Sequence, residues 1–230
     1  MKKILTITPI AYVQSDFPEK FGIPRQSGRA PDLTAKLVFL PEFKNPDFFR
    51  GIDGFSHLWV LFDFSATREK GYSATVRPPR LGGNERVGVF ASRSPFRPNH
   101  IGLSCVKLER ITINEDEVSL TVSGSDFLDG TPVLDVKPYL PFADCITNAT
   151  GGYATTHQND GLQVQCPDEL LQKIPFEKRK GLLQCLADDP RPSYQDDGKI
   201  YGMRFAEYEI KFQVQDGVLT VTNVIENIDI

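Results

Sequence analysis

Residues 86–103 read Arg86-Val-Gly-Val-Phe-Ala-Ser-Arg-Ser-Pro-Phe-Arg-Pro-Asn-His-Ile-Gly-Leu103 and decide how the first half of the chain folds. Val87 and Val89 alternate with smaller residues, which predicts a strand, and a second strand pattern begins at Ile101. Two prolines stiffen the loop between these strands. That loop also carries Arg93, Arg97, Asn99 and His100. Either its guanidinium groups hold an anionic or adenine-bearing ligand, or they cap carbonyls in a plain strand connection.

The composition fits an ordinary globular protein with enough apolar material for a core. The 230 residues allow one large domain or two small ones, and 40% are apolar while 24% are charged. No stretch approaches the roughly 20 apolar residues of a membrane-spanning helix. Four cysteines and three histidines are widely scattered, so neither a disulfide framework nor a metal site is expected. These features predict a reduced, cytoplasmic protein without a membrane partner.

The charge is distributed unevenly along the chain. The net charge of −4 argues weakly against a nucleic-acid partner. Residues 1–142 carry 18 basic and 16 acidic side chains, whereas residues 143–230 carry 8 and 14. Residues 68–97 alone hold seven basic and two acidic side chains. Because salt limits the reach of distant charges to about 8 Å, such a basic arc can attract a polyanion. A solvated surface run is the alternative.

Residues 1–142 are expected to form a mainly β domain. Strand patterns cover residues 4–13, 36–40, 55–64 and 117–123, in addition to the two strands around the arginine loop. Many short strands separated by turn residues predict a barrel or a sandwich. Residues 55–64 form a nearly continuous apolar run, as in a strand buried on both faces or inside a barrel. His57 lies in this run, which favours a core histidine over a catalytic base.

Residues 143–230 are expected to form a smaller α+β domain. Residues 143–165 are small and polar and are interpreted as a linker or an irregular segment. Helical patterns follow over 167–171, with Asp168 as a cap, and over 176–186. Alternating residues from Tyr208 then lead into Asp216-Gly217, which is a strong signal for a tight hairpin.

Candidate functional residues follow the β-rich strands. Asp126 and Asp129 lie in a turn, where carboxylates either cap backbone N–H groups or accept hydrogen bonds from a ligand. Lys137 and Tyr139 lie on a proline-stiffened segment, where the ring either stacks on a base or belongs to the core. The long segments 14–35 and 65–85 are typical of functional loops. The chain has no phosphate-loop, dinucleotide or nucleophile-elbow motif.

Several long phrases resemble one family. These are Phe21-Gly-Ile-Pro-Arg-Gln26, Asp53-Gly-Phe-Ser-His-Leu-Trp59, Arg77-Pro-Pro-Arg-Leu-Gly-Gly-Asn84, the stretch 87–104 and the stretch 128–142. In this order they are similar to the TsaA/YaeB family of TrmO-type tRNA (adenine-N6)-methyltransferases. The similarity continues through Asp189-Pro-Arg-Pro-Ser-Tyr194 and so covers nearly the whole chain.

The resemblance implies a fold and an activity. Residues 1–142 would form a single-sheeted, TsaA-like β-barrel that binds S-adenosylmethionine and catalyses the reaction, and residues 143–230 the smaller α+β domain. The reaction would methylate N6 of threonylcarbamoyl-adenosine next to the anticodon of threonine tRNA. The family also implies a homodimer with the cofactor near the subunit interface.

The resemblance also implies site residues. Carried over by position, the cofactor contacts are Gln26, Ser27, Gly28, Ser65, Ala66, Arg93, Leu103, Asp126, Phe127, Leu128 and Asp129. Since the sulfonium is already activated, positioning supplies much of the catalysis, and a carboxylate near N6 would help remove its proton. Asp126 and Asp129 are the candidates for this role. The tRNA contacts would be Arg80, Arg86, Arg97 and Lys137 on phosphates, with Tyr139 or Phe96 stacking on a base.

Two other functions remain open from the sequence. One is a non-catalytic module that binds S-adenosylmethionine or RNA without turnover. The other is a hydrolase that uses the pair Asp126 and Asp129.

Overall fold

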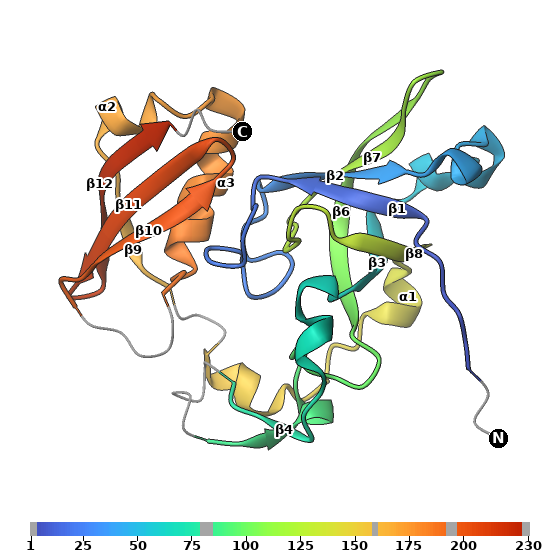
Figure 1. Ribbon diagram of the computed structural model, residues 1–230, viewed down its shortest axis with the longest axis horizontal. Helices are drawn as coiled ribbons and strands as arrows, with labels where there is room; N and C mark the ends of the chain where they lie inside the picture. Colours follow the sequence, from blue (N-terminus) through green and yellow to red (C-terminus); the bar gives the residue numbers. More distant parts are fainter. Residues whose placement is uncertain (1–3, 79–84, 158–160, 192–196, 227–230) are drawn as a thin grey trace.

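The chain folds into a barrel and an open sheet that lie side by side (Figure 1). The computed structural model describes residues 4–78, 85–157, 161–191 and 197–226. In these residues, no helix is long and apolar enough to cross a membrane. The long loop between the first two strands lies between the barrel and the sheet (Figure 1).

The first unit is a closed barrel of six antiparallel strands, as the expected single-sheeted barrel requires. The strands follow the order β1-β2-β7-β6-β3-β8 around the barrel, and β8 pairs back with β1. They are β1 (Ala11–Ser15), β2 (Thr34–Phe39), β3 (His57–Asp63), β6 (Ile101–Ile113), β7 (Val118–Ser123) and β8 (Pro132–Pro138). Closure pairs every strand on both sides, so the barrel has no free sheet edge.

Alternation along the strands builds the barrel core. Leu37, Leu58, Val60 and Leu120 point inward and are fully buried. Of the two expectations for residues 55–64, the strand of a barrel is confirmed, because in β3 buried residues alternate with half-buried ones. His57 is therefore not a core histidine; it lies half-buried outside the barrel, with Nδ1 2.9 Å from the hydroxyl of Ser56.

Several expected strands differ in length from those observed. The first strand begins at Ala11 rather than at residue 4, since residues 4–10 form no ladder. The strand expected after Arg86 is only β5 (Val87–Gly88), which pairs with β4 (Thr75–Val76). A 3₁₀ turn, η6 (Val89–Ala91), follows it directly. Shorter turns and one helix complete this half of the chain: η1 (Pro41–Phe43), η2 (Pro46–Phe49), η3 (Ile52–Gly54), η4 (Ser65–Lys70) and α1 (Pro141–Asp144).

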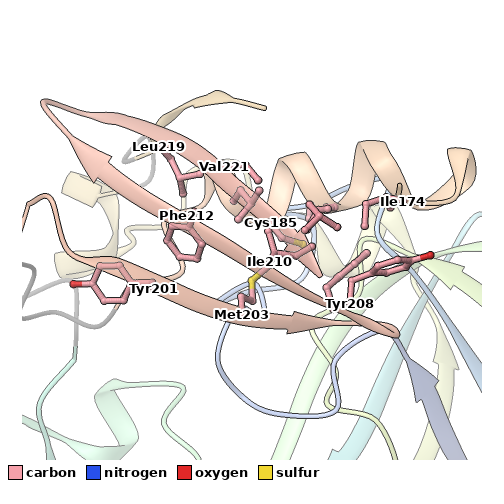
Figure 2. Packing of buried hydrophobic residues seen from close by; sticks show 14 of the residues in the cluster. Ile174, Cys185, Tyr201, Met203, Tyr208, Ile210, Phe212, Leu219 and Val221 are labelled. Atoms are coloured by element: carbon pink, nitrogen blue, oxygen red, sulfur yellow. The ribbon is translucent and has the colours of Figure 1, made fainter. Parts of the chain in front are cut away.

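The second unit is a four-stranded sheet with α3 packed on one face (Figures 1 and 2). The strand order is β10-β11-β12-β9, and β9 runs parallel to β12. Its elements are β9 (Gln163–Gln165), α2 (Asp168–Leu171), α3 (Phe176–Ala187), β10 (Ile200–Phe205), β11 (Tyr208–Gln215) and β12 (Val218–Glu226). The α+β character expected from the sequence is confirmed.

Details of the second unit confirm some predictions and correct others. Asp216 and Gly217 both have positive φ, 50° and 77°, as the predicted two-residue hairpin requires. The segment 143–165, expected to be a linker or irregular, contains the short turn η7 (Gly152–His157) and ends in β9. Asp168 is not the cap of α2, because the preceding Pro167 occupies that position and the Asp168 side chain makes no capping bond.

Candidate active site

A cavity of about 440 Å³ opens at one end of the barrel. Its walls come from the β1–β2 loop (residues 16–33), the η4 turn, the arginine loop and the β7–β8 loop (residues 124–131). The end of β3 and the start of β6 lie at its floor. The lining residues are Lys20, Ile23, Pro24, Arg25, Gln26, Phe62, Asp63, Phe64, Ser65, Ala66, Thr67, Ser92, Arg93, Pro95, Arg97, Ile101, Gly102, Leu103, Ser104, Asp126, Leu128 and Thr131. The barrel thus supplies a rigid floor, and loops supply the walls.

Asp126 lines this cavity, and a side chain of the barrel strand β6 holds its carboxylate. One oxygen, Oδ1, accepts a hydrogen bond of 2.6 Å from the hydroxyl of Ser104, a buried residue of β6. Burial raises the pKa of Asp126 to about 6, although hydrogen bonds from Ser104 and from the amides of Asp126 and Ser27, together with Arg93, oppose the rise. A carboxylate with this pKa is ionised near neutral pH and still accepts a proton readily, as a general base must.

Asp129 occupies a different position, although the sequence suggested the same role for both carboxylates. Its Oδ1 accepts a hydrogen bond of 2.9 Å from the amide of Ser15, and its own amide donates to the carbonyl of Phe17 at 2.9 Å. Asp129 is exposed and does not line the cavity. The structure therefore shows the turn-capping role for Asp129 and places Asp126 alone in the cavity.

The expected cofactor contacts divide into two groups. The residues that line the cavity are Gln26, Ser65, Ala66, Arg93, Leu103, Asp126 and Leu128. Ser27, Gly28 and Phe127 do not line the cavity. The hydroxyl of Ser27 accepts a hydrogen bond from the amide of Cys105 at 3.3 Å, and the amide of Gly28 donates to Gly124 at 2.8 Å. Phe127 belongs to the barrel core with 1% of its surface exposed.

The arginines of the stiff loop play different parts. Arg93 bridges two walls of the cavity, because one guanidinium N–H donates to Oε1 of Gln26 at 2.7 Å. Arg97 lines the cavity and also donates to the carbonyl of Ser92 at 2.9 Å, which stiffens its own loop. His100 ends the loop in a left-handed conformation, with φ of 51°. The carbonyl-capping interpretation is therefore confirmed for Arg97, whereas ligand binding by the loop stays a prediction.

The expected tRNA contacts lie outside the barrel interior. Arg86 is exposed and donates to the hydroxyl of Thr75 at 2.8 Å. Lys137 is exposed and pairs with Asp135 at 2.7 Å. Tyr139 packs against Trp59, with 5.7 Å between ring centroids. Phe96 is half-buried, and Arg80 lies outside the described residues.

Sequence reasoning missed several residues of the cavity, among them Lys20, Asp63 and Ser104. Lys20 lies on its rim, where burial and the nearby Lys70 lower its pKa. Asp63 is 7% exposed at the end of β3 and forms an ion pair with Arg68. Ser104 supports Asp126. A polar residue at an inward position of a strand was the signal for Ser104, and an acidic residue ending an apolar run was the signal for Asp63.

The cavity is suited to a ligand with charged ends and an apolar or aromatic body. Its volume falls within the range of about 300–1,000 Å³ that is usual for small-molecule sites. Carboxylates and guanidinium groups share a wall with apolar side chains such as Phe62 and Leu103. In the described residues, no group of three or more His, Cys, Asp or Glu side chains is placed to hold a metal ion.

Comparison with known proteins agrees with this arrangement. Residues 12–145 match the tRNA-methyltransferase O N-terminal domain, and residues 160–227 match the TrmO C-terminal domain. A tRNA (adenine(37)-N6)-methyltransferase of Escherichia coli is 41% identical over 216 residues, covering 90% of this chain and 92% of that protein. A putative S-adenosylmethionine-dependent methyltransferase, RcsF, of Pseudomonas aeruginosa is 41% identical over 214 residues, covering 89% and 90%.

The solved structures give the same answer. The crystal structure of TrmO from P. aeruginosa superimposes with a TM-score of 0.79 and 33% identity, covering 98% of this chain and all of that one. The fold and cavity define a barrel protein with a small-molecule site at its rim, followed by a small α+β unit. The chain belongs to the tRNA-methyltransferase O (TrmO) family.

Proposed function

We propose that this protein transfers a methyl group from S-adenosylmethionine to N6 of adenine 37 in tRNA, with threonylcarbamoyl-adenosine of threonine tRNA as the nucleoside. The observation that carries the proposal is Asp126, a desolvated carboxylate with a pKa of about 6 in a cavity of cofactor size. Family membership and the names of the relatives support the same reaction.

The cavity residues fit S-adenosylmethionine. This cofactor combines an adenosine, a cationic sulfonium and a zwitterionic amino acid. Arg25 and Lys20 offer cations for its carboxylate, while Asp63 and Asp126 offer acceptors for its positive groups and hydroxyls. Arg93, fixed by Gln26, closes the wall between two loops. When bound, the cofactor supplies an electrophilic methyl group on sulfur, so the chain needs no covalent nucleophile.

Asp126 is the proposed proton acceptor. Methyl transfer forms a bond from N6 to carbon and breaks the bond from carbon to sulfur, leaving the neutral thioether. N6 must then lose one proton, which Asp126 takes on the oxygen that does not accept from Ser104. The Ser104 hydroxyl fixes the orientation of the carboxylate, which is a positioning role. Asp129 contributes to cofactor binding only indirectly in this proposal. It accepts a hydrogen bond from the amide of Ser15, just before the β1–β2 loop.

The proposed tRNA surface lies around the cavity mouth and the outer barrel wall. Arg86 and Lys137 are exposed and supply phosphate contacts, and Arg97 on the cavity rim joins them. Tyr139 and Phe96 supply stacking surfaces for unpaired anticodon-loop bases. Arg80 belongs to the same proposal from its sequence position.

Three further features are part of this proposal. Residues 1–142 act as the catalytic domain and residues 143–230 as a supporting one. The protein works as a homodimer, with the cofactor near the subunit interface. It acts in the cytoplasm, where its tRNA is found.

The test uses purified protein, S-adenosylmethionine and threonine tRNA from a strain in which the gene is deleted. The proposal expects the modified nucleoside to gain the mass of one CH₂ group, and expects no gain with tRNA that lacks the threonylcarbamoyl group. Tight cofactor binding with no transfer to any tRNA would instead indicate a non-catalytic binding module. Turnover without S-adenosylmethionine would indicate a hydrolase.

A further inference from the structure

The β1–β2 loop belongs to the hydrophobic core of the C-terminal unit, although it connects two strands of the barrel. Phe17, Ala30 and Leu33 are buried in one cluster with side chains of α3 and the open sheet. The ring of Phe17 packs edge-on against Phe205 at 5.5 Å, and Phe21 stacks on Phe212 at 6.4 Å. The apolar side of this loop is therefore covered by a unit that begins more than a hundred residues later.

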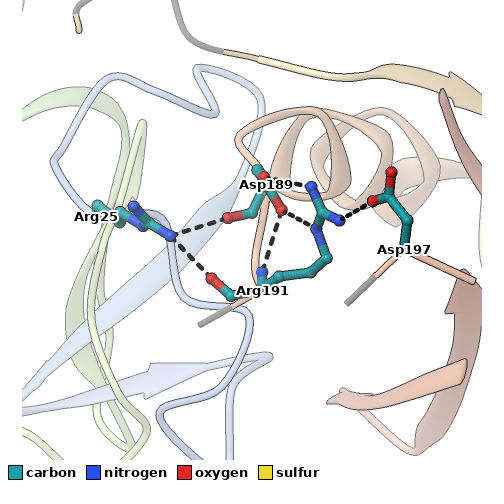
Figure 3. A network of polar contacts seen from close by, with 4 residues as sticks. All are labelled: Arg25, Asp189, Arg191 and Asp197. Atoms are coloured by element: carbon teal, nitrogen blue, oxygen red, sulfur yellow. Dashed lines mark hydrogen bonds and ion pairs between the residues drawn. The ribbon is translucent and has the colours of Figure 1, made fainter. Parts of the chain in front are cut away.

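A polar clamp holds the same loop at the end of α3. Oδ1 of Asp188 pairs with Nε of Arg29 at 2.6 Å, and its Oδ2 accepts from the amide of Arg25 at 3.3 Å. The Asp188 side chain is only 5% exposed. The guanidinium of Arg25 donates to the carbonyls of Asp189 at 3.3 Å and of Arg191 at 2.9 Å (Figure 3). One side chain and two carbonyls after α3 therefore fix both the backbone and the side chain of Arg25.

The clamp is itself held rigidly. The side chain of Arg191 is 5% exposed and pairs with Asp189 at 2.8 Å and with Asp197 at 3.3 Å (Figure 3). Asp189 has a positive φ of 54°, which turns the chain sharply after the helix. The carbonyls that receive Arg25 therefore have little freedom to move.

The opposite side of the loop forms one wall of the cavity. Lys20, Ile23, Pro24, Arg25 and Gln26 all line it. Gln26 in turn receives the hydrogen bond from Arg93, so the position of this wall also sets the position of the arginine loop. A displacement of the wall would change the cavity on both sides.

We propose that Asp188 is a positioning residue for the cofactor site, through which the C-terminal unit holds the β1–β2 loop in its binding-competent position. This inference rests on the proposed function, because the ligand of the cavity is taken to be S-adenosylmethionine. Asp188 touches Arg25 and Arg29, not the cavity itself. Its effect is expected on cofactor affinity and not on the chemical step.

The direct test is isothermal titration of S-adenosylmethionine into the full-length protein and its variants. Asp188→Ala frees the amide of Arg25, so we expect the cofactor Kd and the KM for cofactor to rise about tenfold, a usual size for coupling between sites. At saturating cofactor kcat should stay within about twofold, since a loop position restored by ligand leaves the chemistry intact. Hydrogen exchange at residues 22–28 should quicken in the absence of cofactor.

Arg29→Ala removes the ion pair with Asp188 from the side of the loop. This variant keeps the test valid if Asp188→Ala lowers the thermal stability. Its cofactor Kd should rise in parallel, and Arg29→Lys, which keeps the cation, should recover most of the affinity. Lys180→Ala is the matched control. It removes an ion pair of 3.0 Å between α3 and Asp32, a loop residue that does not line the cavity, so affinity should be unchanged.

Two results would overturn the inference. An unchanged cofactor Kd in both Asp188→Ala and Arg29→Ala would show that the wall does not depend on the clamp. An equal loss in Lys180→Ala would show a general effect of weakening the interface. The proposed function fails separately, if the wild-type protein neither binds S-adenosylmethionine nor methylates tRNA.

Discussion

The barrel and the C-terminal unit bury their hydrophobic cores in different ways. The barrel core lies within residues 11–136, and closure of six strands seals it. The open sheet has α3 on one face, and its core also takes in Phe17, Ala30 and Leu33 from the barrel's own loop. The barrel is self-contained, whereas the second unit is completed by a segment from the first.

This difference also distinguishes the two sides of the cavity, the one that holds the proposed proton acceptor and the one that carries Arg25. Ser104 lies on β6 of the barrel, where it pairs with Val60 of β3, and its hydroxyl holds Asp126, which lies in the β7–β8 loop. The wall that carries Arg25 and Gln26 is a long loop without a strand partner of its own. Hydrogen bonds of Ser27 and Gly28 tie this loop to the barrel side, and Arg25 ties it to the C-terminal unit. The barrel thus orients the proposed proton acceptor, and the C-terminal unit helps to hold the β1–β2 loop that forms the facing wall of the cavity.

The largest expected effect is on the chemistry of the barrel side. Asp126→Asn keeps the shape and the acceptor for Ser104 but removes the base, so methyl transfer should slow by about 10²- to 10⁴-fold. Asp129→Asn is the matched control, because Asp129 caps Ser15 outside the cavity. Single-turnover rates with saturating cofactor and tRNA measure both. Equal losses in the two variants would remove the distinction between these carboxylates.

The second expected effect sharpens the comparison of the two cores. Phe17→Ala should lower the free energy of unfolding by about 3–5 kcal/mol, as for other buried phenylalanines, and should act on the C-terminal unit. Phe127→Ala should cost a similar amount but act on the barrel. Trp59 is the single tryptophan and reports the barrel by fluorescence, while far-ultraviolet circular dichroism reports α3.

The midpoints of the fluorescence and dichroism transitions show which unit each substitution destabilises. In Phe17→Ala the dichroism midpoint should shift to lower denaturant before the fluorescence midpoint does. In Phe127→Ala the fluorescence midpoint should shift at least as far. Coincident transitions in the wild type and both variants would mean that the two units unfold together. The two cores would then not contribute separately to the free energy of unfolding.

A smaller effect is expected where the loop meets the open sheet. Gly22 has a φ of +98°, and an added Cβ would lie 2.1 Å from Sδ of the buried Met203. Gly22→Ala should therefore cost about 2–4 kcal/mol through backbone strain and overpacking. Gly51→Ala is the control, since Gly51 also has positive φ but no neighbour within 4 Å. It should cost about 1 kcal/mol from strain alone. Urea denaturation measures the difference, which should vanish if the loop can move away from Met203.

The smallest expected effect is the pH dependence of stability from Asp126. Its pKa is raised in the folded state from 3.8 to about 6, so the folded protein binds the proton more tightly than the unfolded chain does. The stabilisation by this proton is complete below about pH 4 and is lost as pH rises through about 6. At pH 7, Asp126→Asn should consequently be more stable than the wild type by about 1–3 kcal/mol. Near pH 4 the gain should disappear, and an unchanged difference between these pH values would contradict the raised pKa.

The barrel could be predicted from the sequence because its strands alternate and because long family phrases cover it. The hairpin at Asp216-Gly217 was equally readable, since few other residues tolerate two positive φ angles. The three-residue β9 was not, because Gln163-Val-Gln165 is too short to show a period. The apolar run over β3 left open whether the strand was buried on both faces or belonged to a barrel, because apolar side chains lie on both of its faces.

The candidate site was predictable in outline only. Asp126 and Asp129 share one turn motif, and only the fold shows that one faces the cavity while the other caps Ser15. The dependence of Arg25 on Asp188 joins residues 163 positions apart, and a single sequence carries no signal of such a contact. Local patterns reveal elements and turns, whereas contacts between units follow from three-dimensional packing.

The pH profile of single-turnover methyl transfer, at saturating cofactor and tRNA, tests the central assignment of Asp126 most directly. With Asp126 as proton acceptor, the rate should rise about tenfold per pH unit at acidic pH and level off above about pH 6, following the carboxylate. Asp126→Asn should remove this rise and leave a slow, nearly flat profile. A wild-type rate that is independent of pH through this range, or an Asp126→Asn protein with the wild-type profile, would contradict the account.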